Sequence, residues 1–278
     1  MSGCTSAIED AVGGGKFDHG PADYLSSLPT PNALNQPGGY QTFIESPLDT
    51  EASEADDFKF TLSGIAEEAV PASEVDTRVT IGDVSVLSGT FDPGGVAEAL
   101  DDAEGMSRLG VKAGYERYES EEGRVAYGLG NPLVVGEADL SGGSRVLPRV
   151  NAAIETVTDD AEAYGDVDSN IAATARAVGS PTFGSFSPTQ NLDLESPKDG
   201  VFPGTVAEGY AWTVQGRQTN VSDVVAFESE DAVTVEGLRT WVENNDGERE
   251  QFEHHENISY RQDGILGIID ATVPTAEL

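Results

Sequence analysis

The sequence predicts an α+β fold in which helices cover one face of a mainly antiparallel sheet. Short stretches of alternating apolar and polar residues recur throughout residues 57–278, and amphipathic helical segments separate them. The alternation favours antiparallel pairing, because the strands of a parallel sheet are buried on both faces and tend to be continuously apolar. The order β-β-α-β-β occurs twice, which predicts duplicated units of ferredoxin-like or related type.

The first copy of this order covers Val75–Val135. Strands are predicted at Val75–Ile81 and Val84–Phe91, joined by a glycine-containing turn. A helix follows, with Asp92 as its N-cap and Pro93 at its first position. The segments "GYERYES", "RVAYGLG" and "PLVVGEA" then have the alternation and the glycine turns of further strands.

Two helices are predicted in the middle of the chain. Ser144–Ala161 carries an apolar stripe at three- and four-residue spacing, and Asp166–Gly179 has a capping residue in Asp168. The stripe of the first helix consists of Leu147, Val150, Ile154 and Val157. The segment "PTFGSFSP" that follows is predicted as a strand or an edge segment.

The second copy of the repeated order covers Tyr210–Val273. The segments "VAEGYAWTVQG" and "NVSDVVAFE" predict a strand pair, and "DAVTVEGLRTWVEN" predicts a helix. "EQFEHHENISYR" and "GILGIIDATV" then close as a hairpin through an Asp-Gly turn. The halves 57–200 and 201–278 either share one core or form two domains.

Residues 1–56 are predicted to form a flexible or partly docked tether. The segments "AVGGGKF", "SLPTPNALNQPGGY" and "TEASEADD" combine glycine, proline and acidic residues in the manner of linkers. "ADYLSSLP" and "YQTFIESPL" contain enough apolar residues to dock on the body of the protein.

The charge of the chain is extreme and evenly spread. It has 50 Asp and Glu against 15 Lys and Arg, a formal net charge of −35 in 278 residues. Segments such as "GILGIIDATV" are too apolar for a disordered chain, and cation storage would require clustered carboxylates. Adaptation to molar salt explains the pattern, because a Debye length of about 3 Å at 1 M screens the self-repulsion. Nucleic acid is excluded as a partner, because no basic stripe exists to neutralise phosphates.

The only cysteine of the chain, Cys4, follows Ser2-Gly3. "SGCTS" followed by a glycine- and acid-rich stretch resembles the mature start of a haloarchaeal lipoprotein, and the dispersed acidic charge resembles haloarchaeal proteins in general. The resemblance implies that a signal peptide has been removed before Cys4 and that a lipid on Cys4 holds the protein at the extracellular face of the cell membrane. No stretch reaches the roughly 18–20 apolar residues of a membrane span.

The sequence predicts no catalytic residue, metal site or cofactor. Cys4 lacks a neighbouring base, His19 lies in the tether, and His254 and His255 are neighbours on a predicted strand and therefore point to opposite faces. No serine has the G-x-S-x-G setting of a nucleophile elbow. "DVDSN", residues 166–170, matches only the first ligands of a calcium loop, and we interpret it as a helix cap.

Two N-glycosylation sequons occur, at Asn220 and Asn257. On the predicted strands, Asn220 starts a strand after a turn and could carry a glycan. Asn257 lies within a strand and could do so only on an exposed face.

These observations predict a lipid-anchored surface protein of a halophilic archaeon, without catalysis, that binds a ligand, organises the envelope or assembles. Its partners would be the membrane, through Cys4, and an envelope protein or further copies of itself. Three alternatives stay open: a solute-binding lipoprotein that serves a transporter, an extracellular hydrolase without a recognisable motif, and a cytosolic halophilic protein if Met1 is native.

Overall fold

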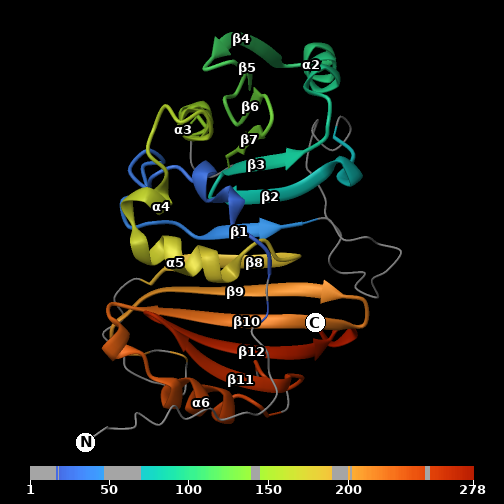
Figure 1. The fold of residues 1–278 in the computed structure, drawn as a ribbon. Coiled ribbons are helices and arrows are strands. Elements are labelled where there is room, and N and C mark those ends of the chain that lie inside the picture. Colours follow the sequence, from blue (N-terminus) through green and yellow to red (C-terminus); the bar gives the residue numbers. More distant parts are fainter. Residues whose placement is uncertain are drawn as a thin grey trace, which may run out of the picture.

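In a computed structural model, the described part of the chain forms a single sheet of twelve strands in which every neighbouring pair is antiparallel. The predicted α+β class with a mainly antiparallel sheet is therefore confirmed. The structure describes residues 17, 19–46, 70–138, 145–189, 200, 202–247 and 251–278. The strand order is β11-β12-β10-β9-β8-β1-β2-β3-β7-β6-β5-β4 (Figure 1).

The bounds of the elements follow from the hydrogen-bond pattern. The strands are β1 (Thr42–Glu45), β2 (Val75–Ile81), β3 (Val84–Gly89), β4 (Met106–Lys112), β5 (Tyr115–Ser120), β6 (Val125–Leu129), β7 (Leu133–Glu137), β8 (Phe183–Pro188), β9 (Thr205–Gln215), β10 (Gln218–Phe227), β11 (Glu256–Asp263) and β12 (Leu266–Pro274). The α-helices are α2 (Pro93–Asp102), α3 (Leu147–Val157), α4 (Tyr164–Val167), α5 (Ser169–Val178) and α6 (Val235–Asn244). Short 3₁₀ turns are η1 (Asp23–Ser27), η2 (Ala72–Glu74), η4 (Glu230–Ala232) and η5 (Thr275–Glu277).

The predicted helix caps are confirmed. The Asp92 carboxylate accepts a hydrogen bond from the Gly94 amide, and Pro93 is the first residue of α2. Asp168 caps α5 and accepts from two backbone amides, which supports its interpretation as a helix cap. These side chains satisfy amide groups that have no partner within the helix. The helix ends at Gly179, whose φ of 67° lies in the region that favours glycine.

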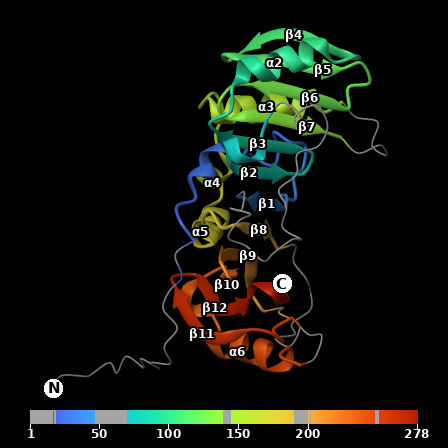
Figure 2. The same cartoon turned by 90° about the vertical axis from the view of Figure 1, so that its right-hand side faces the viewer.

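The two copies of the predicted order join in one sheet. In each half, three consecutive strands form a meander, β1-β2-β3 and β8-β9-β10. A helix follows each meander, and a later strand returns beside its third strand, β7 beside β3 and β12 beside β10. β1 and β8 pair antiparallel at the centre, so the halves are arranged head to head about this pair. The helices α2 and α6 lie at opposite ends of the elongated molecule (Figures 1 and 2).

Part of the predicted tether belongs to the body. Thr42–Glu45 forms β1, a central strand that pairs with both β2 and β8. Tyr24, Leu28 and Leu34, which precede it, are buried in the largest core cluster. The sequence did not reveal this strand because it has only four residues and lies between proline- and glycine-rich turns. Cys4 lies outside the described residues, and so does the segment "FKFTLSGI", residues 58–65, whose alternation of Phe58, Phe60 and Leu62 predicts a strand.

Helices cover both faces of the sheet, so the prediction of one covered face is wrong. On β7, Val134 packs with α3, whereas its neighbour Leu133 packs with α2. On β10, Val224 packs with α5, whereas Val225 packs with α6. Successive residues of a strand point to opposite faces, so consecutive apolar residues on these inner strands require cover on both sides. No helix among the described residues is long and apolar enough to cross a membrane.

Candidate functional site

One row of cross-strand neighbours runs along the sheet face that α2 and α6 cover. Residues paired across strands point to the same face, so the row describes how that face changes along the molecule. From β4 to β11 the row is Arg108, Tyr118, Tyr127, Val135, Ser85, Thr80, Phe43, Ser185, Tyr210, Asp223, Ile269 and Tyr260. Its flanks pack with the two helices, and its centre is mainly polar and half-buried.

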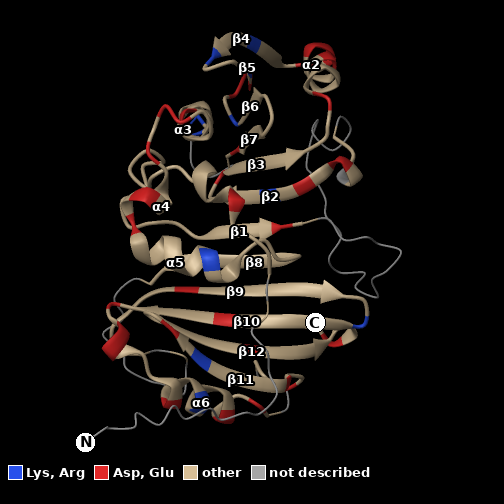
Figure 3. Cartoon of the chain, viewed as in Figure 1, with Lys and Arg blue, Asp and Glu red and all other residues tan. Residues whose placement is uncertain are grey.

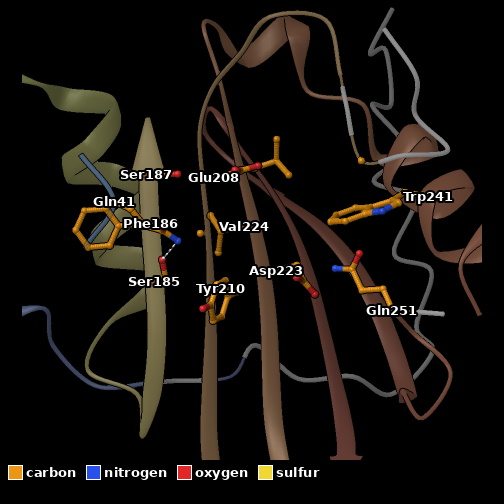
Figure 4. A pocket seen from close by; sticks show the side chains of 13 residues that line it. Gln41, Ser185, Phe186, Ser187, Glu208, Tyr210, Asp223, Val224, Trp241 and Gln251 are labelled. Atoms are coloured by element: carbon orange, nitrogen blue, oxygen red, sulfur yellow. Dashed lines mark hydrogen bonds between the residues drawn. The ribbon is translucent and has the colours of Figure 1, made fainter. Parts of the chain in front are cut away.

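A cavity of about 200 Å³ opens where the polar centre of this row meets α6. β8, β9 and β10 form its floor, and Trp241 and Gln251 stand on the side of α6 (Figure 4). The described residues that line it are Gln41, Ser185, Phe186, Ser187, Gly200, Glu208, Gly209, Tyr210, Asp223, Val224, Val225, Trp241 and Gln251. Ser185, Tyr210 and Asp223 enter it as direct cross-strand neighbours.

Hydrogen bonds order one side of the floor. The amide of Gln41 donates to the Ser185 hydroxyl at 3.1 Å, and Ser185 also bonds to the Tyr210 phenol. Burial raises the pKa of Tyr210, although the bond to Ser185 lowers it in part. The phenol therefore stays protonated at neutral pH, and the floor presents oriented hydroxyl groups.

Asp223 is the group on the floor that lacks a partner. Its carboxyl makes no hydrogen bond or ion pair with any other residue that the structure describes, although its cross-strand neighbours Tyr210 and Ile269 partly bury it. Burial, and after it the charge of Asp270, raises the pKa of Asp223 to about 7. Partial burial of a carboxyl without a donor has a cost in free energy, so a ligand that supplied a donor would be held at this point.

Aromatic packing fixes the wall of the cavity. The Trp241 ring lies 6.1 Å from Phe202 and 5.1 Å from Phe252 between ring centroids, edge to face in both pairs. Gly200, with φ 75°, lies against the indole, and a Cβ atom there would come within 2.8 Å of it. The indole is thus held from several sides, and a glycine is required for the chain to pass so close.

A histidine, a serine and two charged residues form a second polar group, on the opposite face. His19 Nε2 lies 2.8 Å from Ser222 Oγ, which donates to Asp270 at 2.6 Å, and Arg261 donates to the same carboxylate at 2.7 Å. A catalytic triad needs the acid on the histidine and a serine proton free for transfer. Here the serine proton is directed to the acid, so the group is structural and fixes His19, only 6% exposed, to the sheet.

The other two histidines lie in the turn before β11, not on the strand where the sequence placed them. His254 is exposed and lies 3.6 Å from Glu277. His255 packs edge-on against Phe252 at 5.1 Å, and burial lowers its pKa to about 4. Neither lines the cavity. Among the described residues, no group of three side chains is arranged to hold a metal ion.

Asn220 lies near the start of its strand, as predicted, and Asn257 lies within its strand at an exposed position. Asn220 is half-buried within β10, directly between Thr213 and Thr272 of the adjacent strands. Asn257 is exposed at a bulge of the edge strand β11, with φ 54°. Of the two, Asn257 is the more exposed, and its side-chain amide donates to the Thr272 hydroxyl at 2.9 Å.

Sequence reasoning missed the cavity. Its residues come from β8, β9, β10 and α6, which are remote in sequence, and their approach depends on the sheet order. The one local signal was Asp223 in the strand "VSDVVAF", an acidic residue between apolar ones. In a chain with 50 acidic residues, that signal does not stand out.

Comparison with known proteins gives a likeness of fold. No family model matches the chain, and no curated protein matches it. Crystal form IV of TP0453 is similar with a TM-score of 0.50 and 10% sequence identity, over 91% of this chain and 93% of that one. Crystal form III gives a TM-score of 0.48 at 10% identity, over 90% and 94%. At this identity the likeness is one of fold alone.

Proposed function

We propose that the protein is a lipid-anchored binding protein on the outer surface of a halophilic archaeal cell, and that the cavity beneath α6 is its ligand site. The observation that carries the binding role is the unpartnered carboxyl of Asp223 on the floor of a cavity walled by Trp241. An enclosed space with a few converging polar groups and a perturbed pKa is the usual setting of a ligand site.

Binding fits the side chains better than catalysis does. The Ser185 hydroxyl and the Tyr210 phenol bond to each other, and no histidine of the described residues reaches the cavity to act as a base. The set of Ser, His and Asp that is in contact on the opposite face, among the residues the structure describes, is bonded internally. The groups on the floor are therefore suited to holding a ligand rather than to activating a nucleophile.

The surface location rests on Cys4 and on the charge. Acidic residues occur at both ends of the sheet and on the helices (Figure 3), in keeping with a surface that stays hydrated in molar salt. In a full-length precursor, Cys4→Ser should release the protein from membranes into the soluble fraction without changing its thermal stability. A variant that still sediments with membranes would show that attachment comes from elsewhere.

Salt provides a second test of the proposed setting. The Debye length falls from about 30 Å at 0.01 M to about 3 Å at 1 M, so self-repulsion of the folded state weakens strongly. The melting temperature should rise steeply from dilute buffer to molar KCl. An unchanged melting temperature would remove the argument for a halophilic source.

The binding role is tested by titrating small solutes into the purified protein in molar KCl. Organic cations, polyols and amino acids form the first panel, and tryptophan fluorescence and the melting temperature report binding. Trp241→Ala and Asp223→Asn should each remove the response to a solute that binds. Trp212→Phe, on the same sheet face but outside the cavity lining, is the matched control. A solute that binds both cavity variants with the affinity of the parent protein would contradict the proposal.

A further inference from the structure

We propose that the cavity takes a small organic cation, whose ammonium group pairs with the Asp223 carboxylate while its carbon atoms lie against the indole of Trp241. The inference rests on the proposed function and narrows it to a class of ligand. It follows from the charge of the lining, from the aromatic wall and from the size of the space.

The charge of the lining is negative. Its described residues include two carboxyl groups, Asp223 on the floor and Glu208 at the exposed edge, and no lysine or arginine. Asp223 has no donor within the described chain, so it requires one from the ligand. A protonated amine supplies both the donor and the compensating charge, whereas a quaternary ammonium group, which has no N–H, supplies the charge alone. An anionic ligand would meet two like charges with no basic partner among these residues.

The aromatic wall favours a cation over a neutral ligand. Indole is the strongest aromatic partner of ammonium groups, and the pairing gains strength where water is partly excluded. Trp241 is held by Phe202, Phe252 and Gly200, so little ordering of this side chain is needed on binding. Figure 4 shows Trp241, Gln251 and Asp223 around the same space. The cation would therefore meet the carboxylate on one side and the indole on another.

The size and the remaining polar groups limit the ligand further. At about 200 Å³, the cavity is smaller than the roughly 300–1,000 Å³ of sites for drug-sized molecules. The amides of Gln41 and Gln251, with the hydroxyls of Ser185 and Tyr210, can bond a hydroxyl or carbonyl at the far end of the ligand. The fitting class is an amine or quaternary ammonium with a short polar tail.

Binding should be linked to proton release. Pairing favours the ionised carboxyl, so a ligand must displace the Asp223 proton below a pH of about 7. Affinity should then fall towards tenfold per pH unit below 7 and level off above it. The other titratable groups around Asp223 are Glu208 and Tyr210 on β9, Tyr260 on β11, and Asp270 on β12, which acts from the opposite face.

The test uses calorimetric titration of the full chain in molar KCl at pH 8. Choline is compared with 3,3-dimethylbutan-1-ol, which has the same shape and hydroxyl but no charge. Choline should bind at least tenfold more tightly than the neutral alcohol. Asp223→Asn should abolish that preference, and Trp241→Ala should weaken choline at least fivefold. Glu256→Gln, which removes an exposed acid of β11, is the control for a general charge effect.

Each result supports or overturns the assignment of the cavity to an organic cation. Equal binding of the two compounds, or unchanged choline affinity in Asp223→Asn, overturns the organic-cation assignment. Binding of a polyol that depends on Trp241 also overturns it and leaves the binding function standing. Displacement of choline by millimolar Ca²⁺ or Mg²⁺ that bind at Asp223 would assign a metal site instead. If no solute of the panel responds to the cavity variants, both the ligand class and the binding function fall. Circular dichroism confirms that each variant is folded.

Discussion

The ends of one sheet face, beneath α2 and beneath α6, follow the same order of elements and differ in packing. Beneath α2, Tyr118 and Tyr127 of the cross-strand row are fully buried and fill the space under Val96 and Leu100. Beneath α6, the apolar cluster extends from Ile269 of β12 to Val225 and Phe227 of β10, and the part of the face next to Asp223 stays open. The packing beneath α2 thus stabilises the fold, whereas the face beneath α6 retains a polar cavity.

The polar pairs of the row show the same difference. Thr80 and Ser85, on the side of α2, bond to each other at 3.0 Å through their hydroxyls. Tyr210 and Asp223, on the side of α6, are also direct cross-strand neighbours, but Tyr210 bonds to Ser185 and leaves the carboxyl without a partner. The hydroxyls of Thr80 and Ser85 already have hydrogen-bond partners, whereas the Asp223 carboxyl gains a partner only when a ligand binds.

The largest change in the free energy of unfolding should come from removing a buried side chain beneath α2. Tyr127→Ala removes a ring that is 2% exposed and should lower the free energy of unfolding by about 3–5 kcal/mol. Tyr210→Ala removes the same side chain where it is half-exposed beside a cavity, and should cost clearly less. Denaturant unfolding in molar KCl measures both. Equal losses would mean that the two ends do not differ in packing.

The next effect concerns the opposite face, where a polar group is fully satisfied. His19→Ala takes a partner from Ser222 and releases the segment before η1, and should cost about 2 kcal/mol. Limited proteolysis should then cut the chain near residue 19 before the sheet unfolds. A variant as stable and as resistant as the parent would show that this contact does not fix the segment.

An effect of similar size and opposite sign is expected at Asp223. Its pKa is about 7 in the folded protein and about 3.9 in an unfolded chain, so both states hold the proton below pH 4. As pH rises from 4 to 7, only the unfolded state releases it, and stability falls. Asp223→Asn should therefore raise the free energy of unfolding by about 1–3 kcal/mol at pH 8 and hardly at all at pH 4. A destabilised variant at pH 8 would show that the carboxyl has a partner.

The smallest effect is expected at His255, which titrates in the reverse sense. Burial lowers its pKa to about 4, against about 6.5 when unfolded, so stability is present above 6.5 and is lost as pH falls towards 4. The ring is partly exposed, and solvent screening limits the loss to about 1 kcal/mol. His255→Gln should flatten this acid limb in urea titrations, whereas His254→Gln, which removes only the weaker contribution of the neighbouring charge to the lowered pKa of His255, should change it much less. Identical pH profiles for both variants would contradict the assignment.

Local signals made much of the fold predictable. The turns between strand pairs, the caps Asp92 and Asp168 and the stop at Gly179 act within a few residues, so the sequence alone reveals them. Whether helices cover one or both faces of the sheet depends on the order of the strands, and the periodicity of the sequence does not reveal that order. β1 was hidden because its four residues lie between turn-forming segments.

The candidate site was not predictable in the same way. Ser185, Tyr210 and Asp223 become neighbours only when β8, β9 and β10 pair in the observed register. The apolar spacing of "DAVTVEGLRTWVEN" predicts that Trp241 faces inward with its helix, but nothing in that segment indicates that the space beneath it stays open. A functional carboxyl in an acid-rich chain becomes visible only through its burial and its missing partner.

The most direct test of the account is the pKa of Asp223, measured by carboxyl ¹³C NMR with and without choline. The resonance is assigned by its absence in Asp223→Asn. We expect a pKa of about 7 in the free protein, because partial burial without a donor favours the neutral carboxyl, and a pKa lowered by at least one unit at saturating choline. A pKa near 4 that choline leaves unchanged would contradict both the unpartnered carboxyl and the ligand site built around it.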